Sequence, residues 1–129
     1  MRGFIVPAIV AVAAIAPAPA SAAEIRPFSP QAFAAAQRAG RPILIDVHAD
    51  WCPVCRAQDQ ALGPLLKRNE FKNLVVLKLD FDKQAQYWRA MGVRQQSTLI
   101  VFRGRNEVAR EVAETDPEAL AELIRTANR

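Results

Sequence analysis

The sequence predicts a single α/β domain with a central mixed β-sheet flanked by helices. Short apolar runs of strand length alternate along the chain with segments that carry apolar residues at helical spacing. The last two runs surround a turn and are followed by a helix, so part of the sheet is expected to be antiparallel. The chain of 129 residues is long enough for one domain with one modest core.

The first two predicted elements are a helix and a strand. The helix begins at Pro30, because Ser29 can cap it, and it ends at Gly40. The strand covers residues 42–49, whose nearly continuous apolar run is typical of a strand that is buried on both faces.

The middle of the domain contributes two helices and a second buried strand. One helix runs from the cysteine pair to about Leu62, where Gly63-Pro64 is expected to break it. Residues 74–79 form the second apolar strand. Residues 84–91 form a short helix that Gly92 closes.

A hairpin and a helix complete the predicted domain. Residues 98–102 and 108–112 are expected to pair as antiparallel strands around a turn at 103–106. Residues 115–118 are typical of a helix start of the capping-box type. The apolar face of this last helix consists of Leu120, Leu123, Ile124 and Ala127.

Cys52 and Cys55 are the two cysteines of the chain. Two thiols separated by two residues can close a small disulfide ring when their segment begins a helix. The first sulfur then lies at the helix N-terminus, where unpaired N–H groups and the helix dipole favour a thiolate. We therefore predict Cys52 as the partly exposed nucleophile of a thiol–disulfide site. Cys55 is predicted as the resolving thiol, one turn further inside.

Two other uses of a Cys-x-x-Cys motif are excluded by composition. A structural zinc site needs four ligands, and the only histidine is His48, so one chain cannot supply them. Covalent haem attachment requires a histidine directly after the second cysteine, and Arg56 occupies that position. A soft metal such as copper(I), bound by Cys52, Cys55 and His48, remains an alternative.

The N-terminal residues predict an exported protein. Arg2 precedes an apolar run at 4–16, and Ala20-Ser21-Ala22 offers the small residues that a signal peptidase requires. The run is shorter than the ~20 residues needed to span a bilayer, which favours a cleaved signal peptide over an uncleaved anchor. Residues 1–22 are thus predicted as a signal peptide cleaved near Ala22, and residues 23–129 as the mature domain.

The charge pattern argues against a nucleic-acid partner. The formal net charge is +4, and the basic residues are scattered among acidic ones. No arginine-rich strip or aromatic–basic alternation is present in the sequence.

Several residues before and after the cysteine pair form a recognisable pattern in the sequence. They are Ile45-Asp46, the run at 49–55, Lys78, Gly92-Val93 and the run at 98–102. With the order of elements, they resemble the thioredoxin superfamily over essentially the whole mature chain. Residues 49–52 are similar to periplasmic domains that receive electrons from a membrane reductant transporter, and residues 51–57 to thioredoxins of cytochrome c maturation.

The resemblance implies a thioredoxin-like fold and a set of partners. These partners are disulfide-containing periplasmic proteins and a membrane protein that donates electrons. The redox-active disulfide is expected to need no further cofactor, and we expect a monomer.

Asp46 is a second candidate catalytic residue. It points to the same face of its strand as Leu44 and His48, where a carboxylate would be desolvated and its pKa raised. Such a group suits the removal of a proton from Cys55 during resolution. Lys78 on the adjacent strand would offset the buried charge, and a purely structural ion pair between the two is the alternative. His48 either stabilises the thiolate or is a half-buried polar residue without a role.

The residues predicted to face a partner protein are Trp51, Pro53, Val54, Gln96 and Ser97. For Trp51, plain packing is the alternative. Thioredoxin-like proteins usually place a cis-proline where this chain has Ser97. A non-proline cis bond costs ~2.5–4 kcal/mol, so the chain either tolerates that strain or straightens the loop. Ala113 stands where many thioredoxins have a glycine, and both departures suggest a narrower or different set of partners than that of a general thioredoxin.

The sequence thus predicts an exported protein-disulfide oxidoreductase. It would reduce specific periplasmic proteins through a dithiol–disulfide cycle of Cys52 and Cys55, although a proline after the first cysteine occurs in oxidising and reducing relatives alike. The alternatives from other classes are the soft-metal module and an interaction protein whose cysteine pair stays oxidised.

Overall fold

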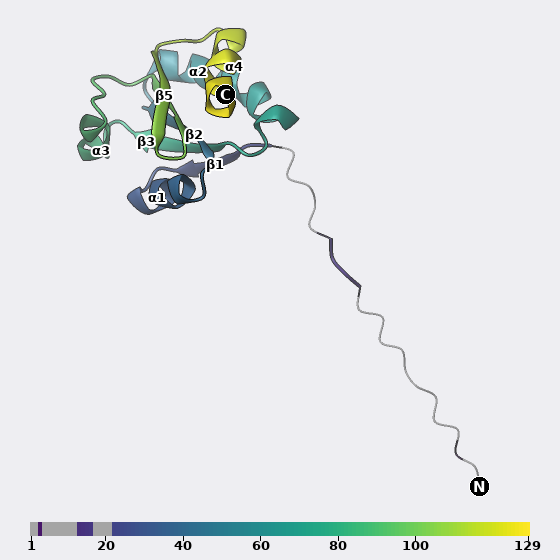
Figure 1. Cartoon of the computed structure of the whole chain (residues 1–129). Coiled ribbons are helices and arrows are strands. Elements are labelled where there is room, and N and C mark those ends of the chain that lie inside the picture. Colours follow the sequence, from purple (N-terminus) through teal and green to yellow (C-terminus); the bar gives the residue numbers. More distant parts are fainter. Residues whose placement is uncertain (1–2, 4–12, 17–21) are drawn as a thin grey trace.

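A computed structural model describes residues 3, 13–16 and 22–129 of the chain (Figure 1). Most of the predicted signal peptide, including Arg2 and most of the apolar run at 4–16, lies outside the described residues. None of the helices in the described part of the chain is long and apolar enough to cross a membrane.

The domain is built on a five-stranded sheet with the order β1-β3-β2-β4-β5. The strands are β1 (Glu24–Pro27), β2 (Pro42–His48), β3 (Val75–Asp80), β4 (Thr98–Arg103) and β5 (Asn106–Val112). β3 pairs in parallel with β1 and β2, whereas β4 pairs antiparallel with β2 and β5. The predicted mixed sheet is therefore confirmed, and its register places Asp46 beside Lys78.

Helices cover both faces of this sheet. They are α1 (Pro30–Arg38), α2 (Pro53–Leu66), α3 (Ala85–Ala90) and α4 (Pro117–Arg125), with short 3-10 turns η1 (Asn69–Phe71) and η2 (Thr126–Asn128). α2 and α4 pack on the face that holds Leu44, whereas α1 and α3 pack on the face that holds Ile43 and Ile45. Figure 1 shows α1 and α4 on opposite sides of the sheet. β2 and β3 are enclosed between the two layers, which explains their continuous apolar sequences.

Side-chain caps fix the starts of α1 and α4. Ser29 Oγ accepts a hydrogen bond from the N–H of Ala32 at 3.0 Å. Asp116 Oδ1 accepts one from the N–H of Ala119 at 2.9 Å. In both helices a proline follows the cap, where its missing N–H costs nothing.

The prediction that α2 ends near Leu62 is wrong, because the helix continues to Leu66 with Pro64 inside it. Pro64 is exposed, so the Gln60 carbonyl that loses its helical partner lies on the solvent side. Leu65 and Leu66 beyond the proline are buried. Burial of a leucine stabilises by about 1.5–3 kcal/mol, and two of them offset the roughly 3 kcal/mol that a helical proline costs.

β1 is an element that the sequence analysis did not predict. It has four residues, mostly exposed, and ends in a proline, so it carries no alternating pattern. The strand forms because its backbone groups make hydrogen bonds with the otherwise unpaired edge of β3. Residues Glu24 to Pro27 pair with that edge in parallel.

Candidate active site

Cys52 is the N-cap of α2, and Cys55 lies in the first turn of that helix. The Sγ of Cys52 accepts a hydrogen bond from the N–H of Cys55 at 3.1 Å. Both cysteines are free thiols, so the structure represents the reduced pair. The first sulfur thus occupies the position where a helix presents unpaired N–H groups and the positive end of its dipole.

The two thiols differ in their pKa. Burial raises the pKa of the Cys52 thiol, but hydrogen bonds from Cys55, Ser97 and the backbone outweigh burial and hold that pKa below its ordinary value. For Cys55, burial first and then the hydrogen bond with Cys52 raise the pKa of the thiol above its ordinary value. A thiolate therefore forms more easily on Cys52 than on Cys55.

The expectation that Cys52 is partly exposed is wrong. Its exposed fraction is 2%, close to the 1% of Cys55. The hydroxyl Oγ of Ser97 lies 3.2 Å from the Sγ of each cysteine, so this side chain sits against both sulfurs.

Ser97 adopts a backbone conformation that the sequence left open. The Gln96–Ser97 peptide bond is trans, and Ser97 has a left-handed φ of 64°. Its N–H donates to the carbonyl of Val47 at 2.8 Å, and its carbonyl accepts from the N–H of Ala113 at 2.9 Å. The side-chain amide of Gln58 donates to the same carbonyl at 3.1 Å. Of the two outcomes expected without a proline, the chain has taken the trans loop.

Ala113, at the position where glycine is common in thioredoxins, also has a left-handed φ, of 60°. Glycine adopts this region without steric cost, whereas the Cβ of alanine crowds the backbone there. A glycine at this position would avoid the strain that Ala113 carries.

Asp46 lies on β2 with an exposed fraction of 1%. Neither of its carboxylate oxygens has a hydrogen-bond partner within the described chain. Burial raises the pKa of Asp46 to about 6, against the opposing effect of the Lys78 ammonium. The Nζ of Lys78 lies 3.8 Å from the Asp46 carboxylate, so the two charges face one another without forming a hydrogen bond.

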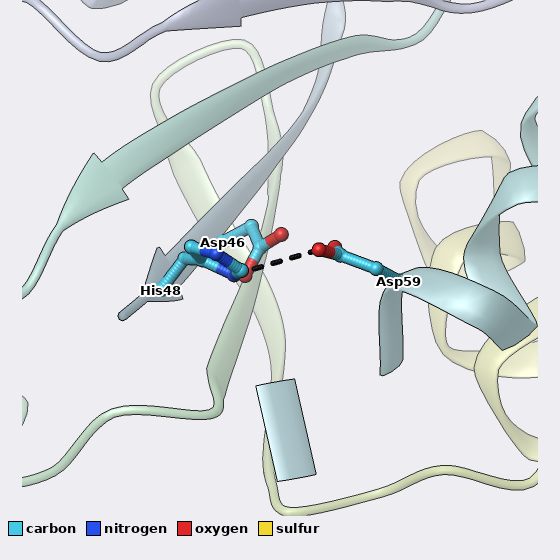
Figure 2. A group of neighbouring side chains, drawn as sticks. All are labelled: Asp46, His48 and Asp59. Carbon is cyan, nitrogen blue, oxygen red and sulfur yellow. Dashed lines mark ion pairs between the residues drawn. The ribbon is translucent and has the colours of Figure 1, made fainter. Parts of the chain in front are cut away.

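Asp59 is a charged residue of this site that sequence reasoning missed. Its Oδ1 accepts a hydrogen bond from Lys78 at 2.8 Å, and its Oδ2 lies 3.7 Å from the Nδ1 of His48. Figure 2 shows Asp59 extending from α2 toward Asp46 and His48 on β2. The available signal was spacing, since Asp59 follows Cys55 by four residues and shares its side of a helix.

The structure groups His48 with acids rather than with sulfurs. Its Nε2 lies 3.2 Å from Asp50, and its Nδ1 faces Asp59. Within the described residues, one group of side chains could offer three metal ligands whose atoms all lie within 4.8 Å of one another: Asp46, His48 and Asp59. The ammonium group of Lys78 already places a positive charge beside Asp59 in this group. The arrangement therefore does not favour the copper alternative, which needs His48 beside both cysteines.

Three apolar side chains beside the buried sulfurs are exposed. Trp51 is 56% exposed and Val54 is 38% exposed, and Pro53 between the cysteines is exposed as well. The indole N–H of Trp51 donates to Asp82 at 2.8 Å, which fixes the orientation of the ring. Gln96 is half-buried beside Ser97.

The chain matches the Thioredoxin family model over residues 24–126. Among individual relatives, thioredoxin Asp f 29 of Aspergillus fumigatus is 30% identical over 69% of this chain and 80% of its own length. A thioredoxin of Chlamydia muridarum is 34% identical over 64% of this chain and 78% of its own length.

Solved structures agree with this match. The structure of Trxlp from Edwardsiella tarda is 44% identical, with a TM-score of 0.77 over 78% of this chain and 98% of that protein. A thioredoxin from Halobacterium salinarum is 24% identical, with a TM-score of 0.72 over 88% of this chain and 97% of that protein. At this level of identity, the similarity supports the fold and nothing further. The family match and the cysteine pair at the start of α2 together show that the chain belongs to the thioredoxin family and is a thiol–disulfide oxidoreductase.

Proposed function

We propose that this thioredoxin-family protein is exported and reduces disulfides of specific periplasmic proteins. The charged and apolar N-terminal pattern supports export, with residues 1–22 as a signal peptide and residues 23–129 as the working domain. Disulfides form readily in that compartment, so a reductase there would restore thiols on chosen proteins.

The pKa difference between the two thiols carries the proposed reaction. Cys52 attacks one sulfur of the partner's disulfide, a mixed disulfide forms, and the other partner sulfur leaves as a thiolate. Cys55 then attacks the Sγ of Cys52, which closes the internal disulfide and releases the second partner thiolate. Two electrons pass from the dithiol to the partner, and a membrane protein is proposed to return them.

Asp46 is proposed to accept the proton of Cys55 before that second attack. Cys55 has a raised pKa, so its thiol needs a base in order to react. Asp46 is buried on the β2 face that α2 covers, and both of its oxygens are free to accept a proton. Lys78 and Asp59, each more than one-third exposed, connect this carboxylate to solvent.

The exposed residues beside the sulfurs form the proposed docking face for partners. Trp51, Pro53 and Val54 offer apolar surface that a partner covers on binding, and Gln96 borders it. Because Ser97 lies against both sulfurs and Cys52 is 2% exposed, docking is proposed also to displace this residue. That requirement supports a narrow set of partners, each of which supplies the binding energy to open the site.

The proposal is tested by trapping mixed disulfides in the organism that produces the protein. A tagged Cys55→Ala variant should accumulate a few covalent partners in the periplasmic fraction, because the resolving thiol is missing. The matched Cys52→Ala variant, which keeps the other cysteine, should trap none. Partners found only in the cytoplasm would contradict export, and equal trapping by both variants would contradict the assignment of the nucleophile.

Direction is tested by the redox state of the wild-type protein in the cell. A reductase should be mostly reduced at steady state, and deletion of its gene should leave the trapped partners more oxidised. Partners that lose disulfides on deletion would identify an oxidase instead.

A further inference from the structure

Gln58 is a buried polar side chain to which the thiol chemistry gives no role. It lies on α2, three residues after Cys55, with an exposed fraction of 1%. Its amide nitrogen donates to two backbone carbonyls, that of Ser97 at 3.1 Å and that of Glu114 at 3.0 Å. Its own oxygen has no partner within the described chain. A glutamine in this position therefore costs desolvation, which its two donated hydrogen bonds must offset.

These two hydrogen bonds connect two loops of the domain to one side chain. Ser97 precedes β4, and Glu114 follows β5, so one side chain of α2 joins both loops to the helix that carries the cysteines. Ser97 is a non-glycine residue in the left-handed region, a conformation that persists only when neighbouring groups fix it. Val47 fixes its N–H, and Gln58 and Ala113 fix its carbonyl.

We infer that Gln58 is a positioning residue that raises the reduction potential of the Cys52–Cys55 pair by acting through Ser97. It holds the Ser97 backbone so that the hydroxyl stays 3.2 Å from each sulfur. A hydroxyl at that distance stabilises the thiolate of the reduced pair. The disulfide, which the dithiol forms by giving up two electrons and two protons, carries no such charge. The hydroxyl therefore favours the reduced form, and a stabilised reduced form means a higher potential.

The inference rests on the dithiol–disulfide cycle alone, so it stands or falls separately from export, partner choice and direction. Its test is the equilibrium of the purified protein with glutathione. Gln58→Met keeps the length and shape of the side chain but removes both donors. We expect the equilibrium constant to move about tenfold toward the disulfide, which corresponds to a potential lower by about 30 mV.

A double-mutant cycle separates action through Ser97 from a general effect on folding. Ser97→Ala removes the hydroxyl and should itself lower the potential. In that background, Gln58→Met should produce no further shift, because the group that it positions is gone. Leu62→Met is the matched control, since Leu62 is buried on the same helix and should leave the potential unchanged.

Two results would overturn the inference. One is a folded Gln58→Met protein with the wild-type potential, and the other is the same shift in the presence and absence of the Ser97 hydroxyl. If Gln58→Met does not fold, Gln58→Asn retains an amide that is one methylene shorter. It should lower the potential in the same direction, and a wild-type value in this variant would equally refute the inference.

Discussion

Ser97 and Ala113 are the two non-glycine residues with positive φ in the described part of the chain, and a hydrogen bond of 2.9 Å joins the N–H of Ala113 to the carbonyl of Ser97. Each left-handed residue costs about 1–2 kcal/mol relative to an ordinary conformation. Ser97 lies against both sulfurs, and backbone strain at such a site is often retained because function requires it. The loop that places Ser97 beside the sulfurs is thus held in a backbone conformation that its residues do not favour.

Ser97→Pro should destabilise the domain, because the native residue has φ 64° and donates its N–H to Val47. Proline has neither that φ nor an N–H, so we expect a loss of about 3 kcal/mol or more. Urea unfolding measures the change, and Ser97→Gly, which keeps the N–H and tolerates positive φ, should remain close to wild type. Wild-type stability of Ser97→Pro would show that the loop can adopt a conformation that accepts proline.

Ala113→Gly should increase stability slightly, by up to about 1 kcal/mol, because glycine relieves the left-handed strain in the folded state. The gain is small because glycine also makes the unfolded chain more flexible, which opposes folding. Thermal unfolding of the reduced protein measures this change. The same variant should reduce insulin disulfides at least as fast as wild type, since the backbone of a partner can approach more closely. A clear loss of stability would mean that the methyl group makes contacts that outweigh its strain.

Cys52 should react with iodoacetamide faster than Cys55 near neutral pH, because its pKa is lowered and that of Cys55 is raised. A lowered pKa moves the rise of rate with pH below the pH at which an ordinary cysteine thiol shows it. Ser97→Ala should move the rise back upward. Peptide mapping after alkylation assigns each site, and faster labelling of Cys55 would reverse the assigned roles.

The two cysteines should also differ in their effect on turnover. Cys52→Ser should abolish reduction of insulin disulfides, because no attacking thiolate remains. Cys55→Ser should instead accumulate mixed disulfides, which non-reducing gels detect. Residual turnover in Cys52→Ser would show that Cys55 can attack on its own.

Asp46→Asn should stabilise the protein at neutral pH by up to about 3 kcal/mol. Burial raises the pKa of Asp46 from 3.8 to about 6, so the folded state binds more protons than the unfolded state between these values. Stability of the wild type therefore falls as pH rises from about 4 to above 6, and the asparagine variant should lack this fall. Urea titrations across that range measure the difference.

The same Asp46→Asn variant should slow resolution of a mixed disulfide more than its formation, as stopped-flow reaction with a model disulfide would show. The group that it loses serves Cys55 rather than Cys52. An unchanged resolution rate together with lower stability would favour the structural ion pair between Asp46 and Lys78.

The sheet and the cysteine pair could be predicted because each leaves a local pattern. Strands enclosed on both faces, such as β2, have nearly continuous apolar sequences. Two cysteines separated by two residues at the start of a helix indicate thiol–disulfide chemistry without further information. The four-residue β1 has no such pattern, since it exists only through the edge of β3.

Gln58 and Asp59 could not be predicted for a different reason. Their roles depend on which side of α2 meets the loops and which meets β2, and the sequence of a helix does not specify the register of its contacts across space. Ser97 was identified by position, but its trans, left-handed conformation depends on hydrogen bonds from other elements. The local conformational preferences of the sequence do not predict these tertiary hydrogen bonds.

The N–H of Ala23 donates to the carbonyl of Leu66, the last residue of α2, at 2.8 Å. In the uncut chain this nitrogen is a neutral amide. Cleavage after Ala22 would make it the α-amino group of the mature protein, mostly protonated at neutral pH. A positive charge at the C-terminal end of a helix contributes about 0.3–1 kcal/mol. If the proposed leader is removed, the junction between β1 and α2 would be tightened, and this cleavage would itself be a stabilising modification at a single nitrogen atom.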